Sequence, residues 1–222
     1  MIEAELRASP RPYLVAITGS VAAGKSTLAS TLAAALRPRW KVDVVNTDGF
    51  LFPNAVLEAR DLMQRKGFPE SYDQAALDRF VAELKAGVAP LRVPLYSHVR
   101  YDVVEEVQLV DRADVVILEG LQSIRDGVDF SIYVDAPERE LETWFLARLQ
   151  TLREDPRSFL HAYTEEELLP LAKDVWRTIN LVNLREHIAR DRERARVVVE
   201  KGADHAVQRI AVNDRRRAGV DR

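Results

Sequence analysis

The stretch Gly19-Ser-Val-Ala-Ala-Gly24-Lys25-Ser26-Thr27 decides the fold class of this chain, because it matches the pattern G-x-x-x-x-G-K-[ST] at every fixed position. Its flanks agree: residues 13–18 form a short apolar run typical of a buried strand, and residues 28–36 are rich in Ala and Leu, which favours a helix. Backbone N–H groups between such a strand and helix point at a phosphate. The predicted phosphate-binding residues are Gly19, Ser20, Val21, Ala22, Ala23, Gly24, Lys25, Ser26 and Thr27.

Two residues are candidate magnesium ligands. The hydroxyl of Ser26 is the loop's usual metal ligand, and Glu119 directly follows the apolar run Asp114-Val-Val-Ile-Leu118. A carboxylate at the end of a second buried strand suits Mg²⁺, which prefers hard oxygen ligands. The alternatives are a glycine turn that merely begins a helix and a solvent-facing Glu at a strand end.

Composition narrows the class of protein. A length of 222 residues and a hydrophobic fraction of 47% fit one α/β domain with its own core. The chain has 35 acidic and 32 basic residues, which argues against a general nucleic-acid binder. It has no Cys, no basic-then-apolar signal peptide and no run of membrane-spanning length, so we expect no membrane partner and a cytoplasmic location.

Hydrophobic periodicity predicts a mostly parallel central sheet flanked by helices, a three-layer α/β/α fold. Pro94 restricts residues 91–95 to an edge or irregular strand. We expect a lead-in at residues 1–12, a single domain at 13–213 and a basic tail at 214–222. The other predicted strands are 41–47, 114–118, 131–135, 196–200 and 206–212, and the predicted helices are 28–36, 54–65, 73–86, 137–152 and 164–179.

Asp48 is the candidate catalytic residue. It follows the predicted strand 41–47, and ligands of open parallel sheets bind outside the carboxyl ends of the strands. The alternative is an ordinary Asp-Gly turn. Tyr96 and His98 would share one face of an extended segment, and with Tyr101 they could hydrogen-bond a polyhydroxy substrate.

Several blocks of the sequence closely resemble the bacterial type I pantothenate kinases, which are P-loop kinases related to uridine kinase and phosphoribulokinase. The resemblance covers nearly all of residues 13–212. The blocks are Thr47-Asp-Gly-Phe-Leu-Phe-Pro-Asn54, residues 62–73, Tyr96-Ser-His98-Val-Arg-Tyr101-Asp102, Glu119-Gly-Leu121, residues 130–135, Trp176-Arg-Thr-Ile-Asn180, Asn183-Leu184 and Lys201-Gly-Ala-Asp-His205.

The resemblance implies an ATP- and Mg²⁺-dependent kinase that converts pantothenate to 4′-phosphopantothenate, the first step of coenzyme A biosynthesis, and it suggests a homodimer. It makes Asp48 the acceptor of the hydroxyl proton, Arg148 a stabiliser of transition-state charge, and Lys25 and His98 further catalytic residues. Asn183 followed by Glu186 is interpreted as a helix-capping pair. The implied acceptor-binding residues are Asp48, Lys66, Tyr96, His98, Tyr101, Phe145, Arg148 and Asn180.

Four departures from the family pattern concern the surroundings of the phosphate site. The family carries a longer segment before the first strand. Phe145 stands where the family has Tyr, and residues 153–163 are fewer and poorer in aromatics, with Leu160 in the place of a pocket Phe. Ser30 replaces an arginine that helps the family bind coenzyme A as a feedback inhibitor. Two other functions therefore stay open: a kinase for another small hydroxyl compound, such as a nucleoside or a pantothenate derivative, and a regulatory nucleotide-binding protein without catalysis.

Overall fold

The structure, a computed structural model, describes residues 2–213. The predicted basic tail at 214–222 lies outside these residues. Within residues 2–213 no helix combines the length and the apolar character needed to cross a membrane. The N-terminal lead-in contains a helix that its sequence did not suggest, α1 (Ile2–Ala8), and its Leu6 is fully buried in the core.

A six-stranded sheet forms the centre of the molecule, with strand order β2-β5-β1-β6-β7-β8. All neighbours pair in parallel except β7 and β8, which are antiparallel. The predicted mostly parallel sheet is confirmed. Each run of residues that the sequence predicts as a strand of this sheet forms one strand of it. The strands are β1 (Tyr13–Gly19), β2 (Val42–Asn46), β5 (Val115–Glu119), β6 (Phe130–Asp135), β7 (Val197–Lys201) and β8 (Val207–Val212).

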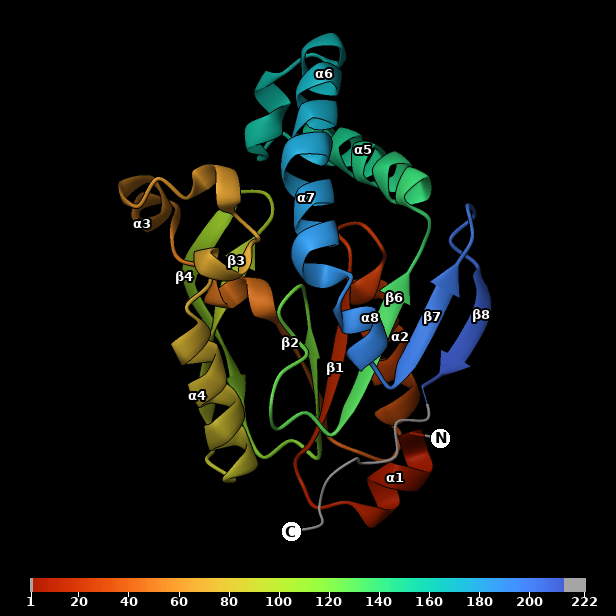
Figure 1. Cartoon of the computed structure of the whole chain (residues 1–222). Helices are drawn as coiled ribbons and strands as arrows, with labels where there is room; N and C mark the ends of the chain where they lie inside the picture. The colour runs from red at the N-terminus through yellow and green to blue at the C-terminus, as the bar shows by residue number, and fades with distance from the viewer. Residues whose placement is uncertain (1, 214–222) are drawn as a thin grey trace.

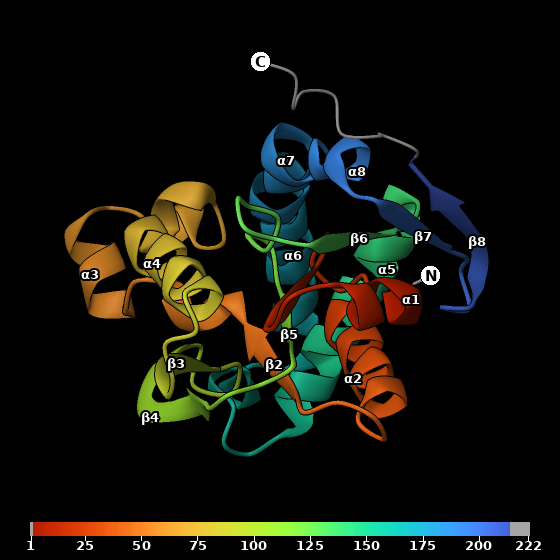
Figure 2. The ribbon, with the colours of Figure 1, turned by 90° about the horizontal axis from the view of Figure 1, so that it is seen from below.

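Helices cover both faces of this sheet, as Figure 2 shows. Val15 and Ile17 of β1 belong to the same core cluster as the buried alanines of α2 (Lys25–Leu36), whereas Leu14 belongs to the cluster of α4 (Gln74–Lys85). Successive strand residues point to opposite faces, so one strand supplies both cores. The three-layer arrangement is therefore confirmed.

A separate hairpin lies beside α4 and consists of β3 (Leu91–Ser97) and β4 (Asp102–Val110). Its register shifts between Pro94 and Leu95, which confirms the predicted irregular strand. Strand β4 is not predicted from the sequence, because its central residues Glu105 and Glu106 are both exposed and hide the alternation of a strand.

The segment before the hairpin is less helical than predicted. The helix expected at 54–65 ends early as α3 (Asn54–Ala59), followed by the short 3₁₀ turns η2 (Met63–Arg65) and η3 (Pro69–Ser71). Asp61 adopts a left-handed φ of 56°, which a helix cannot continue through.

Helices α5, α6 and α7 stand beyond the carboxyl ends of the parallel strands, at the top of Figure 1, whereas α8 lies lower, beside β6. The helix predicted from residue 164 is confirmed, including the capping box between Thr164 and Glu167. It continues through two π-helical turns, so Asn183 lies in the helix interior and the predicted Asn183–Glu186 cap is wrong. The elements are α5 (Glu138–Glu154), η4 (Phe159–Ala162), α6 (Glu165–Val175), η5 (Trp176–Asn180), α7 (Leu181–Asn183), η6 (Leu184–Ile188) and α8 (Asp191–Arg194).

Candidate active site

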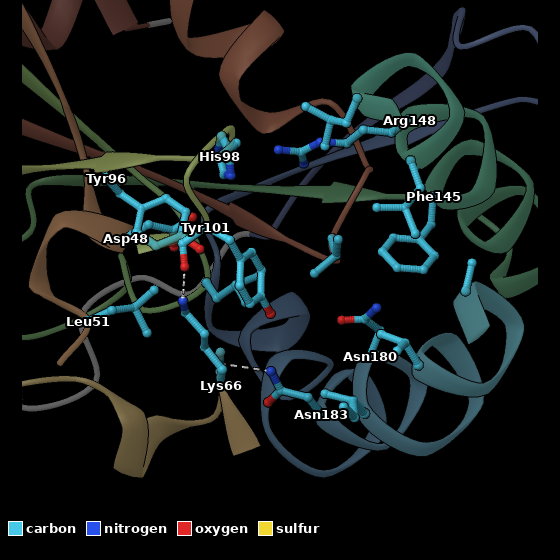
Figure 3. A pocket seen from close by; sticks show the side chains of 18 of the residues that line it. Asp48, Leu51, Lys66, Tyr96, His98, Tyr101, Phe145, Arg148, Asn180 and Asn183 are labelled. Carbon is cyan, nitrogen blue, oxygen red and sulfur yellow. Dashed lines mark hydrogen bonds between the residues drawn. The ribbon is translucent and has the colours of Figure 1, made fainter. Parts of the chain in front are cut away.

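A cavity of about 460 Å³ lies between the sheet, the hairpin and helices α5 to α7. Figure 3 shows Tyr96, Tyr101 and Lys66 on one side of it and Phe145 and Asn180 on the other. The cavity brings together residues that the sequence separates by as many as 162 positions, from Val21 to Asn183. The predicted site residues that line it are Val21, Lys25, Ser26, Asp48, Lys66, Tyr96, His98, Tyr101, Glu119, Phe145, Arg148 and Asn180.

The phosphate-binding loop joins the end of β1 to the start of α2. Gly24 adopts the left-handed φ of 87° at the N-cap of α2, and the Lys25 ammonium donates to the carbonyl of Ser20 at 2.8 Å. Burial lowers the pKa of Lys25, against the opposing charges of Glu119 and Asp48. Of the nine loop residues, Val21, Lys25 and Ser26 line the cavity. The other six loop residues form the turn that positions these three.

Ser26 and Glu119 meet at the carboxyl ends of β1 and β5. The Ser26 hydroxyl donates to Glu119 Oε1 at 2.8 Å, and the Asn46 side chain donates to the same oxygen at 2.9 Å. Glu119 is 4% exposed, and burial raises its pKa while Lys25 opposes the shift. A hydroxyl and a carboxylate this close, beside the phosphate loop, are hard oxygen ligands that fit Mg²⁺.

Asp48 lies in the 3₁₀ turn η1 (Thr47–Phe50) and lines the cavity. Its backbone N–H donates to Asn46 Oδ1 at 2.7 Å, and the Tyr72 hydroxyl donates to its Oδ1 at 3.0 Å. Burial raises the pKa of Tyr72, so the hydroxyl stays a donor. The Tyr72 contact orients the Asp48 carboxylate, and the Asn46 contact fixes the backbone that carries it.

Three aromatic residues of the hairpin form one wall. The rings of Tyr96 and His98 are 5.1 Å apart, which confirms that they share a face, and Tyr101 lies 6.4 Å from Tyr96. Burial lowers the pKa of His98, and the nearby positive charge of Arg148 lowers it further. His98 is therefore a neutral imidazole at neutral pH.

Lys66 is 8% exposed and lies against the rings of Tyr96 and Tyr101. Its ammonium donates to Asn54 Oδ1 at 2.6 Å and to the Tyr101 carbonyl at 2.5 Å. Burial lowers its pKa to about 8, against the negative charges of Asp102 and Asp48. Two of its three N–H donors are therefore engaged by the protein, which leaves one for a ligand.

The helices supply the opposite wall. Phe145 is buried with its ring 5.7 Å from that of Trp176, while Arg148, one turn later on α5, lines the cavity. Within residues 2–213 Arg148 has no ion pair or side-chain hydrogen bond, so its charge is available to an anion. Asn183 also lines the cavity, and its amide donates to the carbonyl of Gly67 at 2.9 Å.

The segment 153–163 contributes aromatic surface to the cavity. Phe159 and Tyr163 line the cavity together with Leu160, and the Phe159 ring lies 5.1 Å from Tyr101. The expectation that this segment is poorer in aromatics than in the family stays a prediction. Two of its aromatic residues nevertheless face the cavity.

Four residues that orient or contact predicted site residues were not singled out from the sequence. Asn46 and Tyr72 orient the two carboxylates, Asn54 engages Lys66, and Lys201 donates from its ammonium to the carbonyl of Ala23 at 3.0 Å. Each acts through a contact between distant segments. No local motif signals such contacts.

Comparisons with known proteins agree with this geometry. The model of the phosphoribulokinase/uridine kinase family matches residues 14–151. A pantothenate kinase of Myxococcus xanthus is 49% identical over 90% of this chain and 71% of its own length, and one of Rhizobium rhizogenes is 47% identical over 90% and 69%. In the fold alone, a D-glycerate 3-kinase of Cryptococcus neoformans is similar, with a TM-score of 0.67, 15% identity and coverage of 94% of both chains.

The family model spans the phosphate loop, the β3–β4 hairpin and most of α5, and each of the two pantothenate kinases aligns with 90% of this chain. The relatives are kinases of small molecules, and the parts of a nucleotide-dependent phosphotransferase are present in this chain. The chain therefore belongs to the phosphoribulokinase/uridine kinase family and, within it, groups with the bacterial pantothenate kinases.

Proposed function

We propose that this protein transfers the γ-phosphoryl group of ATP to the primary hydroxyl of pantothenate, giving 4′-phosphopantothenate in the first step of coenzyme A biosynthesis. The observation that carries the proposal is the shared cavity, which Asp48 lines together with Lys25 and Ser26 of the phosphate loop and the polar residues Tyr96 and His98 of the hairpin. The names of the relatives supply the acceptor. This is a small-molecule kinase site in which positioning and charge stabilisation do most of the chemistry.

The donor side would hold the nucleotide phosphates. The Lys25 ammonium would exchange the Ser20 carbonyl for phosphate oxygens, and the N–H groups at the start of α2 would point at the same oxygens. Ser26 and Glu119 would hold Mg²⁺, which supplies positive charge to the transferring phosphoryl group when bound.

On the acceptor side, Asp48 would accept the proton of the attacking hydroxyl, held in place by Tyr72 and by its own N–H on Asn46. Arg148 would stabilise charge on the transferring group. The residues that would position the acceptor are Lys66, Tyr96, His98, Tyr101, Phe145 and Asn180.

The test is a coupled assay of ADP release with Mg²⁺ and four acceptors: pantothenate, pantetheine, uridine and glycerate. We expect the highest kcat/KM with pantothenate. Faster turnover of uridine or glycerate would make this a kinase of another hydroxyl compound, and no ADP release with any acceptor would favour a regulatory role.

The proposal includes the oligomeric state of the protein and its place in the cell. By resemblance to the pantothenate kinases, we expect a homodimer that works in the cytoplasm on a small-molecule substrate. Light scattering coupled to size-exclusion chromatography measures the mass directly, and a monomeric mass at assay concentrations would contradict the dimer.

A further inference from the structure

The aromatic wall of the site is built on a hairpin that shares no hydrogen-bonded ladder with the central sheet. Its position relative to Asp48 therefore depends on individual contacts. Near Asp48, a Cβ on Gly49 would lie 1.9 Å from the carbonyl oxygen of Pro94, so the backbones of η1 and β3 touch there. The Gln108 side chain also donates to the carbonyl of Val44 at 2.9 Å. Neither contact reaches the turn that carries Tyr101.

That turn is held by a different group of contacts. Tyr101 adopts a left-handed φ of 55°, which is unfavourable for a residue with a large side chain. Its carbonyl accepts two hydrogen bonds, from the Asn54 side-chain amide at 3.0 Å and from the Lys66 ammonium at 2.5 Å. The next residue, Asp102, accepts from the backbone N–H of Asn54 at 2.9 Å.

Asn54 is the centre of these contacts. It is the first residue of α3. Its backbone N–H donates to Asp102, its side-chain amide donates to the Tyr101 carbonyl, and its amide oxygen accepts from Lys66. Its oxygen accepts from the Lys66 ammonium at 2.6 Å. Because Asn54 is neutral, this bond holds the buried ammonium in place without neutralising its positive charge. Asn54 itself does not line the cavity.

We propose that Asn54 is a positioning residue for the acceptor. By fixing the Tyr101 carbonyl and the Lys66 ammonium together, it sets the angle at which the Tyr101 ring and the remaining Lys66 donor face the cavity. Figure 3 shows Tyr101 and Lys66 side by side. The proposal rests on the proposed function in taking the acceptor to be pantothenate. It predicts an effect on acceptor binding that leaves the nucleotide site unchanged.

The test compares Asn54→Ala with Glu58→Ala, an exposed residue of the same helix without a side-chain partner among residues 2–213. We expect Asn54→Ala to raise the KM for pantothenate about tenfold, the effect of losing one well-placed hydrogen bond to a charged group, with the KM for ATP unchanged. Glu58→Ala should leave both constants unchanged. Equal rises in both KM values, or no rise for pantothenate, would overturn the proposal.

A double-mutant cycle separates positioning from general destabilisation. Tyr101→Gly removes the ring and suits the left-handed backbone. If Asn54 acts through that ring, Asn54→Ala should cost much less in the Tyr101→Gly background, whereas full additivity would contradict the idea. If Asn54→Ala does not fold, Asn54→Asp decides the question, because it keeps the size but places an oxygen against the Tyr101 carbonyl and should also raise the KM.

The same experiments keep the two proposals apart. Turnover of pantothenate by the unmodified protein tests the proposed function. The ratio between variant and unmodified protein tests the role of Asn54, and it can be measured with whichever acceptor the assay identifies.

Discussion

The two halves of the cavity are held in place in different ways. The donor half, made of residues 19–27, Asn46 and Glu119, stands on strands that are hydrogen-bonded neighbours, and Asn46 and Glu119 are direct partners in the parallel register of β2 and β5. The acceptor half, made of the β3–β4 hairpin and helices α5 to α7, is joined by side-chain contacts between distant segments. The sheet thus fixes the phosphate chemistry, while the acceptor wall can change without disturbing it.

The largest expected effect lies where the two halves meet. Asp48→Asn keeps the size of the side chain but removes the proton acceptor, so kcat should fall about 10²–10⁴-fold while the KM for ATP changes little. Initial rates at varied ATP provide the measurement, with the exposed Asp126→Asn as a matched control. An unchanged kcat would return Asp48 to the status of a turn residue.

The second-largest expected effect concerns the donor half alone. Lys25→Met keeps the apolar stem but removes the charge that faces the phosphates, and kcat should fall about 10²–10³-fold, as for other lost electrostatic contacts to a transition state. Binding of pantothenate, measured by calorimetry, should persist. Near-normal turnover would show that the loop is not the catalytic phosphate site, and the exposed Lys173→Met serves as control.

A smaller effect concerns regulation beside the donor half. Ser30 is exposed on α2 and offers no charge to an inhibitor's phosphates, so coenzyme A should inhibit weakly, and Ser30→Arg should tighten inhibition about tenfold. Phe159 and Tyr163 keep aromatic surface in the cavity, so this prediction depends on the charge at position 30 alone. Titration of coenzyme A at fixed ATP measures it, and tight inhibition of the unmodified protein would refute it.

The smallest effect belongs to the acceptor half and depends on pH. Because the pKa of Lys66 is about 8, its ammonium is charged below that pH and neutral above it. Its attraction for an acceptor carboxylate should therefore weaken as pH rises, and the KM for pantothenate should increase a few-fold between about pH 7 and pH 9. Lys66→Met should show a high KM without this step. A step that persists in Lys66→Met would assign the titration to another group.

The contrast between the halves also explains what the sequence could predict. The phosphate loop, the flanking strand and helix, and Glu119 at a strand end are local patterns, and the structure places them as expected. The early end of α3 at Ala59 was missed, because it depends on the left-handed backbone of Asp61.

The residues that orient the site residues could not be predicted from the sequence either, because they lie far from them along the chain. Tyr72 meets Asp48 across 24 positions and Asn54 meets Tyr101 across 47, and neither pair has a spacing that any motif describes. The pairing with Glu186 three residues later predicts a helix cap at Asn183. Instead, the Asn183 side-chain amide donates a hydrogen bond to the carbonyl of Gly67, 116 positions away. Folding, rather than local pattern, makes these contacts.

The most direct test of the account is the position of the new phosphate on the product. Pantothenate incubated with ATP, Mg²⁺ and the protein should give one product, whose phosphorus NMR signal couples to the methylene protons of the primary alcohol. That result would identify the primary hydroxyl of pantothenate as the phosphoryl acceptor. Phosphorylation of the secondary hydroxyl, or ATP turnover that leaves pantothenate unmodified, would contradict it.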